Sequence, residues 1–450
     1  MQHVLIHRSA LRTYLSYILP SVIALTLTSI YGVFDGIFVG HAVGDAGLAG
    51  INVAFPLQTL VMAAAMGIGM GSAVISSVEK GKGDLERSQR AAGNAFVLLL
   101  GAAIPLALLL HLGARPLCEL LGGSGETLEQ ATLYISVIAW GVPFQVFVGG
   151  SMALIRNRGG VNYAMVTQIL SGLINIVLDY LFVIAWNYGI QGAAAATVIS
   201  QCFAFCSCGV FFSRPKNRLP RTAFVPDGAL MRHALRLGAA PFGLTLLPDA
   251  TVVVINVNAN LVGGEAAVAT YAVISYVAFI AQLLIQGVAD GSQPLISMRC
   301  GTGDADAVRR LRNTNYLVCF GIGALGLAAL TLLSRQIPIL FGASPATVEA
   351  VAHALPIYSV SYLLYAFTHP SISYFYAIDD AKASTRLVIG EAVLVVACVC
   401  VMAQTLGLDG IWWSVTVVQG LLGLLALREL RAAKRELAQR EMQSTHGRAS

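Results

Sequence analysis

Four polar residues stand in otherwise apolar stretches, and together they supply the groups that hold a small cation. Asp35 lies near the end of the apolar run 19–40, and burying an ionised carboxylate in hydrocarbon costs about 2.5–3.5 kcal/mol. Asn175 and Asp179 are four residues apart, so they share one face of a helix. With Thr197 they offer two carboxylates, an amide oxygen and a hydroxyl, which suit Na⁺. Two close carboxylates equally share a proton, because their like charges repel.

These side chains are expected at one depth in a membrane. Asp179 lies ten residues before Gly189 and Thr197 lies eight residues after it, across a short turn. Asp35 is also near the outer end of its run, so at about 1.5 Å per residue all of them fall in the outer third of the bilayer. Pro20, fifteen residues before Asp35, lacks a backbone N–H, and we interpret it as a hinge. The alternative is that these polar groups only join neighbouring helices.

The composition indicates an integral membrane protein. Of 450 residues, 56% are hydrophobic and 11% are charged, and the mean hydropathy is +0.73; soluble domains average about 25% charged residues. A helix crosses a bilayer with about 20 residues. Twelve stretches are long enough: 14–39, 51–78, 91–111, 131–155, 163–185, 191–212, 235–262, 268–297, 314–333, 351–376, 386–404 and 410–430. We therefore predict an all-α membrane protein with twelve transmembrane helices.

The basic residues indicate the orientation. Of 28 Lys and Arg residues, all but Arg115 and Arg335 fall on one side of these twelve spans. By the positive-inside rule that side is the cytoplasm, which places both termini inside. The formal net charge of +5 is therefore no sign of nucleic-acid binding, and the partner that the composition predicts is the lipid bilayer. The eight Cys residues form neither a disulfide framework nor a zinc-site spacing.

The two halves of the chain repeat. The matched motifs are GKGD at Gly81–Asp84 with GTGD at Gly301–Asp304, Gly67 and Gly71 with Gly287 and Gly291, and GIQG at Gly189–Gly192 with GLDG at Gly407–Gly410. An even number of helices per half gives both halves one orientation, as in one class of secondary transporters. We expect two pseudo-symmetric six-helix lobes. Their bounds are 1–212, a cytoplasmic inter-lobe loop at 213–236, 237–430, and a cytoplasmic tail at 431–450. Gly67–Gly71 is predicted to pack closely against another helix.

The run Ser29–Leu57, the GKGD motif, the segment ALIRNRGGVNYAM at Ala153–Met165 and the two-fold layout resemble the multidrug and toxic compound extrusion (MATE) family. They look closer to its DinF-like bacterial branch than to its other branches. The resemblance implies an antiporter of the bacterial inner membrane that exports diverse, often cationic small molecules by alternating access. It implies coupling to H⁺ or Na⁺ and no cofactor. Position by position, it implies a coupling role for Asp35, Asn175, Asp179 and Thr197, with Tyr134 lining the same region.

A polyspecific cleft is built from ordinary aromatic and Met side chains, and these define the candidates for substrate contact: Tyr134, Phe55, Met66, Phe144, Phe147 and Phe279, with the acid Asp290. Three acids of the second half, Asp249, Asp290 and Glu391, have either structural or functional roles that the sequence leaves open. The position equivalent to Asp35 is about Asn256, so the second lobe lacks the same acid. We expect a monomer.

The nearest rival is a flippase for a lipid-linked saccharide of the same superfamily. Its pyrophosphate cargo requires several Arg or Lys side chains in the cleft, and no Lys or Arg falls well inside a predicted span. A membrane enzyme is disfavoured, because no His, Asp and Glu cluster has metal-site spacing. No phosphate-binding GxxxxGK[ST] motif occurs, which argues against transport driven by ATP hydrolysis in this chain. A channel is the third alternative, and counterflow in liposomes distinguishes it from a carrier.

Overall fold

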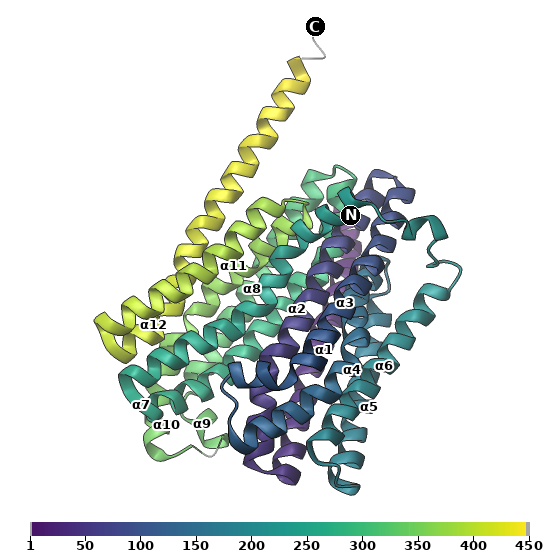
Figure 1. Cartoon of the computed structure of the whole chain (residues 1–450). Helices are drawn as coiled ribbons and strands as arrows, with labels where there is room; N and C mark the ends of the chain where they lie inside the picture. Colours follow the sequence, from purple (N-terminus) through teal and green to yellow (C-terminus); the bar gives the residue numbers. More distant parts are fainter. Residues whose placement is uncertain (1, 342, 447–450) are drawn as a thin grey trace. The chain divides into compact units, whose positions relative to one another are not determined.

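The computed structural model describes the backbone of residues 2–341 and 343–446, and their side chains except those of 2–10, 28–37, 45 and 434–446. This part of the chain contains helices and no strand. Figure 1 labels the α-helices in chain order. They are α1 (Gln2–Val43), α2 (Asp45–Lys82), α3 (Leu85–Leu120), α4 (Gly125–Asn157), α5 (Val161–Asp179), α6 (Gly189–Ser213), α7 (Gly228–Gly301), α8 (Ala305–Leu332), α9 (Gln336–Leu340), α10 (Pro345–Ser359), α11 (Ser361–Ala377) and α12 (Ala381–His446). A π-helix, η1 (Tyr180–Ala185), follows α5, and a 3₁₀ turn, η2 (Arg221–Phe224), precedes α7.

Two of these helices each contain two predicted spans. α7 is interrupted at Gly264 (φ 63°) and α12 at Gly407 (φ 64°), where the backbone is not helical. Glycine adopts such positive φ angles without the steric cost that other residues meet. α10 and α11 meet at a bend of 41°, and together they are long and apolar enough for one span. With these divisions each of the twelve predicted spans coincides with helical segments of the described residues, and the all-α membrane fold is confirmed. By length and composition, eight of the described helices could cross a membrane, or nine if α10 and α11 are one span. The five-residue α9 was not predicted.

The repeated motifs GKGD and GTGD form turns of one kind. Gly83 (φ 88°) ends α2, and the carboxylate of Asp84 caps α3 by accepting a backbone N–H at 2.8 Å. In the second half Gly303 has φ 74°, and Asp304 accepts a backbone N–H at 2.9 Å as α8 begins. An acid at this position satisfies a free N–H and complements the helix dipole. GKGD and GTGD therefore each stop one helix and start the next.

The chain forms two compact units. Unit 1 comprises Met1–Asp249, Gln286–Asn313 and Tyr376–Ala381, and unit 2 comprises Ala250–Ile285, Thr314–Phe375 and Lys382–Ser450. Each unit has its own apolar core. The core of unit 1 includes fully buried Leu99 and Ile135, and that of unit 2 includes fully buried Ile274. The predicted lobe bounds at 212, 237 and 430 stay a prediction.

Close backbone contacts at glycines hold the helices of unit 1 together. A methyl group added to Gly69 would overlap the backbone of Gly150 on α4. At Gly71 it would overlap the carbonyl oxygen of Ala234 on α7. Small residues permit such approach, whereas any side chain would push the helices apart. The predicted close packing of Gly67–Gly71 is confirmed.

The inter-lobe segment (residues 214–227) is bonded to α3 along its second part. Asn94, which is 2% exposed, donates hydrogen bonds to the carbonyl oxygens of Ala223 (3.2 Å) and Val225 (3.1 Å). Its own amide oxygen accepts the backbone N–H of Asp227 at 2.8 Å. A methyl group at the neighbouring Gly93 would overlap the carbonyl of Ala223. The segment is therefore part of unit 1, although its composition is that of a linker.

Candidate ion-coupling site

Two of the predicted ligands, Asn175 and Thr197, contact each other in unit 1. Asn175 and Asp179 lie on the last turns of α5, and their side chains are 1% and 0% exposed. Thr197 lies on α6, and its hydroxyl oxygen accepts a hydrogen bond from Nδ2 of Asn175 at 3.5 Å. The amide oxygen of Asn175 is buried and accepts no hydrogen bond within the described part of the chain. That oxygen is therefore available to a cation or to a proton donor.

The helix changes geometry directly after Asp179. Tyr180–Ala185 form η1, and the chain leaves it with the N–H of Trp186 bonded to the carbonyl of Leu181 at 2.8 Å. π-helical turns are rare and occur frequently at functional sites. The sequence did not predict this change, because the apolar run 163–185 has the composition of one uninterrupted helix.

Asp35 belongs to α1, but its side chain lies outside the described residues, so its proximity to Asp179 stays a prediction. Among the side chains that are described, no group of three or more His, Cys, Asp and Glu could hold a metal ion. Because that finding does not include Asp35, Na⁺ binding at the predicted site also stays a prediction. Pro20 is buried within α1, and its role as a hinge is likewise a prediction.

Tyr134 is 2% exposed on α4, and its hydroxyl accepts a hydrogen bond from Nε2 of Gln58 on α2 at 3.3 Å. Gln58 was not among the predicted site residues. The signal that would have found it is an amide in the middle of an apolar span, because polar side chains there need a partner.

The aromatic candidates for substrate contact have several different surroundings. Phe144 and Phe147 pack on Phe205 of α6, with ring centroids 5.4 and 5.8 Å apart. Phe55 of unit 1 and Phe279 of unit 2 are about half exposed, and Met66 is half-buried. Their contact with substrate stays a prediction.

Asp290 belongs to a buried polar network in unit 1. It accepts a hydrogen bond from the hydroxyl of Tyr376 at 3.3 Å, and the positive charge of Arg156 acts on it. The predicted span 131–155 ends one residue before Arg156, whereas in the structure Arg156 belongs to the last turn of α4 and is 6% exposed. Next to it, Nδ2 of Asn157 donates to Oε1 of Gln293 at 2.9 Å. Counting basic residues along the sequence cannot detect such burial. The count does not show whether a residue at the end of a helix faces other helices or the solvent.

The other acids of the second half also have polar partners. Asp249, in unit 1, is hydrogen-bonded to the side chain of Thr59. In unit 2, Glu391 is buried and accepts a hydrogen bond from Gln419 at 2.8 Å. Each acid therefore has a neighbour that satisfies part of its hydrogen-bonding capacity.

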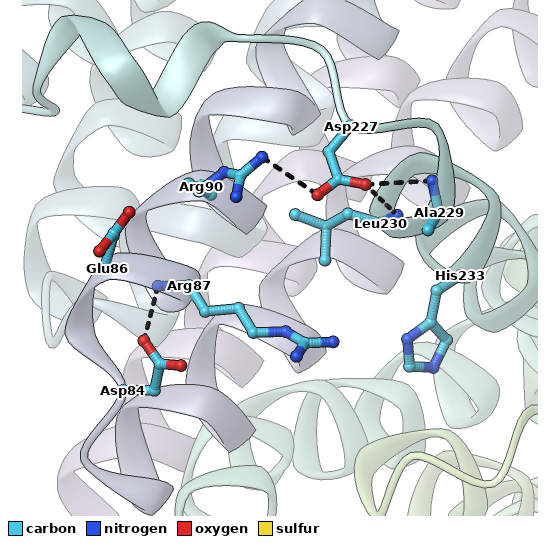
Figure 2. A pocket seen from close by; sticks show the side chains of 8 residues that line it. All are labelled: Asp84, Glu86, Arg87, Arg90, Asp227, Ala229, Leu230 and His233. Atoms are coloured by element: carbon cyan, nitrogen blue, oxygen red, sulfur yellow. Dashed lines mark hydrogen bonds and ion pairs between the residues drawn. The ribbon is translucent and has the colours of Figure 1, made fainter.

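A cavity of about 590 Å³ lies in unit 1 where α3 and α7 begin (Figure 2). Its lining residues carry both signs of charge: Asp84, Glu86, Arg87, Arg90, Asp227, Ala229, Leu230 and His233. Arg90 pairs with Asp227 at 3.1 Å. The first N–H groups of α7, that of Leu230 above all, and then the charge of Arg90 lower the pKa of the Asp227 carboxyl. None of the predicted coupling residues lines this cavity.

Comparisons with known proteins agree with this fold. The family model MatE matches residues 20–181 and 250–402. The multidrug export protein MepA of Staphylococcus haemolyticus (strain JCSC1435) is 23% identical over 424 residues, which is 93% of each chain. The solved outward-facing structure of a multidrug resistance MATE family transporter of the MOP superfamily has a TM-score of 0.89 at 22% identity, over 95% of this chain and 96% of that one. A crystal structure of MATE in a bent conformation has a TM-score of 0.88 at 22% identity, over 95% and 97%.

Proposed function

Because this chain belongs to the MatE family and is a bacterial MATE transporter, we propose that it exports diverse, often cationic small molecules from the cell by alternating access. The multidrug export activity named for its relative MepA supports this proposal. The two separate matches to one family model also support it, since they correspond to the two repeated halves. No cofactor is part of the proposal.

We propose that export is coupled to inward movement of H⁺ or Na⁺ at Asp35, Asn175, Asp179 and Thr197. The observation that carries this proposal is the full burial of Asp179 beside the free amide oxygen of Asn175, where α5 gives way to η1. A unit charge that crosses the membrane inward gains about 2.3 kcal/mol per 100 mV. A gain of this size shifts a two-state equilibrium about fiftyfold, which is enough to favour one opening of a cleft over the other.

Drug uptake into liposomes that contain the purified protein tests the coupling, with H⁺ and Na⁺ gradients imposed separately. Asp179→Asn should retain its fold and lose gradient-driven uptake, because the neutral amide no longer exchanges charge. Glu119→Gln is the matched control, since Glu119 is an exposed acid of the same unit paired with Arg115. Gradient-driven uptake by Asp179→Asn at the wild-type rate would refute the assignment.

The alternative function is flipping of a lipid-linked saccharide. Arg156 is the observation in its favour, because a buried guanidinium suits a pyrophosphate group. Its charge is already offset by Asp290, and a pyrophosphate requires several such groups. Drug resistance in an efflux-deficient host, measured beside complementation of a cell-wall flippase defect, distinguishes the two functions.

A further inference from the structure

Three polar side chains form a hydrogen-bonded chain inside unit 2. Glu391 lies in the first part of α12, Gln419 in its second part, and Thr368 on α11. Nε2 of Gln419 donates to Oε1 of Glu391 at 2.8 Å, and the hydroxyl of Thr368 donates to Oε1 of Gln419. All three residues are buried, at 8%, 4% and 1% exposure. The chain therefore connects three helical segments through one carboxylate, one amide and one hydroxyl.

The three residues lie at one depth. Glu391 is nine residues after Lys382, Gln419 is nine before Arg428, and Thr368 is nine before the end of α11. At about 1.5 Å per residue, each lies roughly 13 Å from the helix ends that the basic residues assign to the cytoplasm.

Glu391 has no cationic partner among the described residues. Arg386, on the same helix, instead pairs with Glu429 at 3.0 Å. His369, next to Thr368, has its Nδ1 bonded to the hydroxyl of Tyr365 at 2.9 Å. An ionised carboxylate without a counter-charge is costly in an apolar bundle, whereas a carboxylic acid can donate its proton to an amide oxygen.

We propose that Glu391 is a second proton-binding site and that Gln419 relays its occupancy to Thr368. This proposal rests on the proposed function in one respect: the H⁺ that binds Glu391 is supplied by the imposed gradient. When Glu391 binds H⁺, its hydroxyl donates to Oε1 of Gln419 after the amide rotates by half a turn. Nε2 of Gln419 then donates to Oγ1 of Thr368. The hydroxyl of Thr368 turns to the carbonyl oxygen of Tyr365, which it already approaches at 3.4 Å.

Each hydrogen bond of the chain reverses its direction, and none is lost. An amide serves this purpose because it carries a donor and an acceptor that exchange places on rotation. A metal ion fits the site poorly, because the amide presents its NH₂ to the carboxylate and no second acid contacts it among the described side chains. The ligand that suits this arrangement is therefore a proton.

Infrared difference spectroscopy of the full-length protein in lipid nanodiscs, recorded between acidic and alkaline pH, tests the proposal. The wild type should show the carbonyl band of a carboxylic acid that titrates with pH. Glu391→Gln should lose this band, Glu391→Asp should restore a band, and Gln419→Leu and Thr368→Val should shift its frequency. Glu429→Gln is the matched control, because Glu429 is a buried acid on the same helix that has a cationic partner, and it should leave the band unchanged.

An unchanged band in Glu391→Gln would overturn the proposal. If that variant does not fold, as judged by gel filtration, Gln419→Leu still decides: an unshifted frequency there excludes Gln419 as the relay. Drug uptake driven by a H⁺ gradient is measured in the same variants. Loss of the band in Glu391→Gln together with an absence of H⁺ coupling in the wild type would exclude H⁺ as the coupling ion and leave the site standing.

Discussion

Replacing Asn94 by alanine should release the inter-lobe segment from α3. The substitution removes three hydrogen bonds to that segment and leaves the carbonyls of Ala223 and Val225 and the N–H of Asp227 without their partner. At about 0.5–1.5 kcal/mol for each bond, local opening of the segment becomes easier by about 1.5–4.5 kcal/mol. The open population, and with it the rate of proteolysis, should rise roughly tenfold to a thousandfold.

Trypsin provides the assay, because the segment offers exposed cleavage sites after Lys216, Arg218 and Arg221. Asn313→Ala is the matched control, since Asn313 is an exposed amide of the same unit. Cleavage of the Asn94→Ala variant at the wild-type rate, at a thermal midpoint that is also unchanged, would refute the reasoning that these bonds hold the segment in place.

Two further perturbations test the packing and the electrostatics of unit 1. Gly71→Val should destabilise the protein by about 1–3 kcal/mol or more, because the new side chain overlaps a carbonyl of α7, whereas Gly101→Val, where nothing lies within 4 Å, should change the thermal midpoint little. The folded protein lowers the pKa of Asp227, so this carboxyl stabilises the folded state above its unfolded pKa of about 4. That contribution is lost as the pH falls through the lower folded pKa. When the thermal midpoint is measured against pH, Asp227→Asn should therefore show a smaller loss of stability at acidic pH than the wild type. An equal loss in the variant would contradict the role assigned to Asp227.

The local chemistry of the turns could be predicted from the sequence. Gly83 with Asp84, and Gly303 with Asp304, are recognisable as a helix stop followed by a cap, because each residue acts through its own backbone neighbourhood. Hydropathy over about 20 residues likewise detects spans even where two of them join at a single glycine, as at Gly264.

Features that depend on distant partners could not be predicted. The burial of Arg156 follows from the face of α4 that it occupies, and the bonds of Asn94 follow from a segment about 130 residues further on. The candidate ion-coupling site could be predicted in part. The spacing of Asn175 and Asp179 predicts their shared face, but the change to π geometry after Asp179 has no signature in an apolar run.

The η1 turn makes the C-terminal end of this span sensitive to residue number. A π turn contains about one residue more than an α turn, and one residue corresponds to about 100° of rotation in an α-helix. Deleting a single residue between Tyr180 and Ala185 would therefore allow an ordinary α-helix to form. It would also rotate Phe182, whose ring stacks on Trp186 at 5.3 Å, away from its present direction. Length, rather than side-chain identity, decides where these aromatic rings lie relative to Asp179.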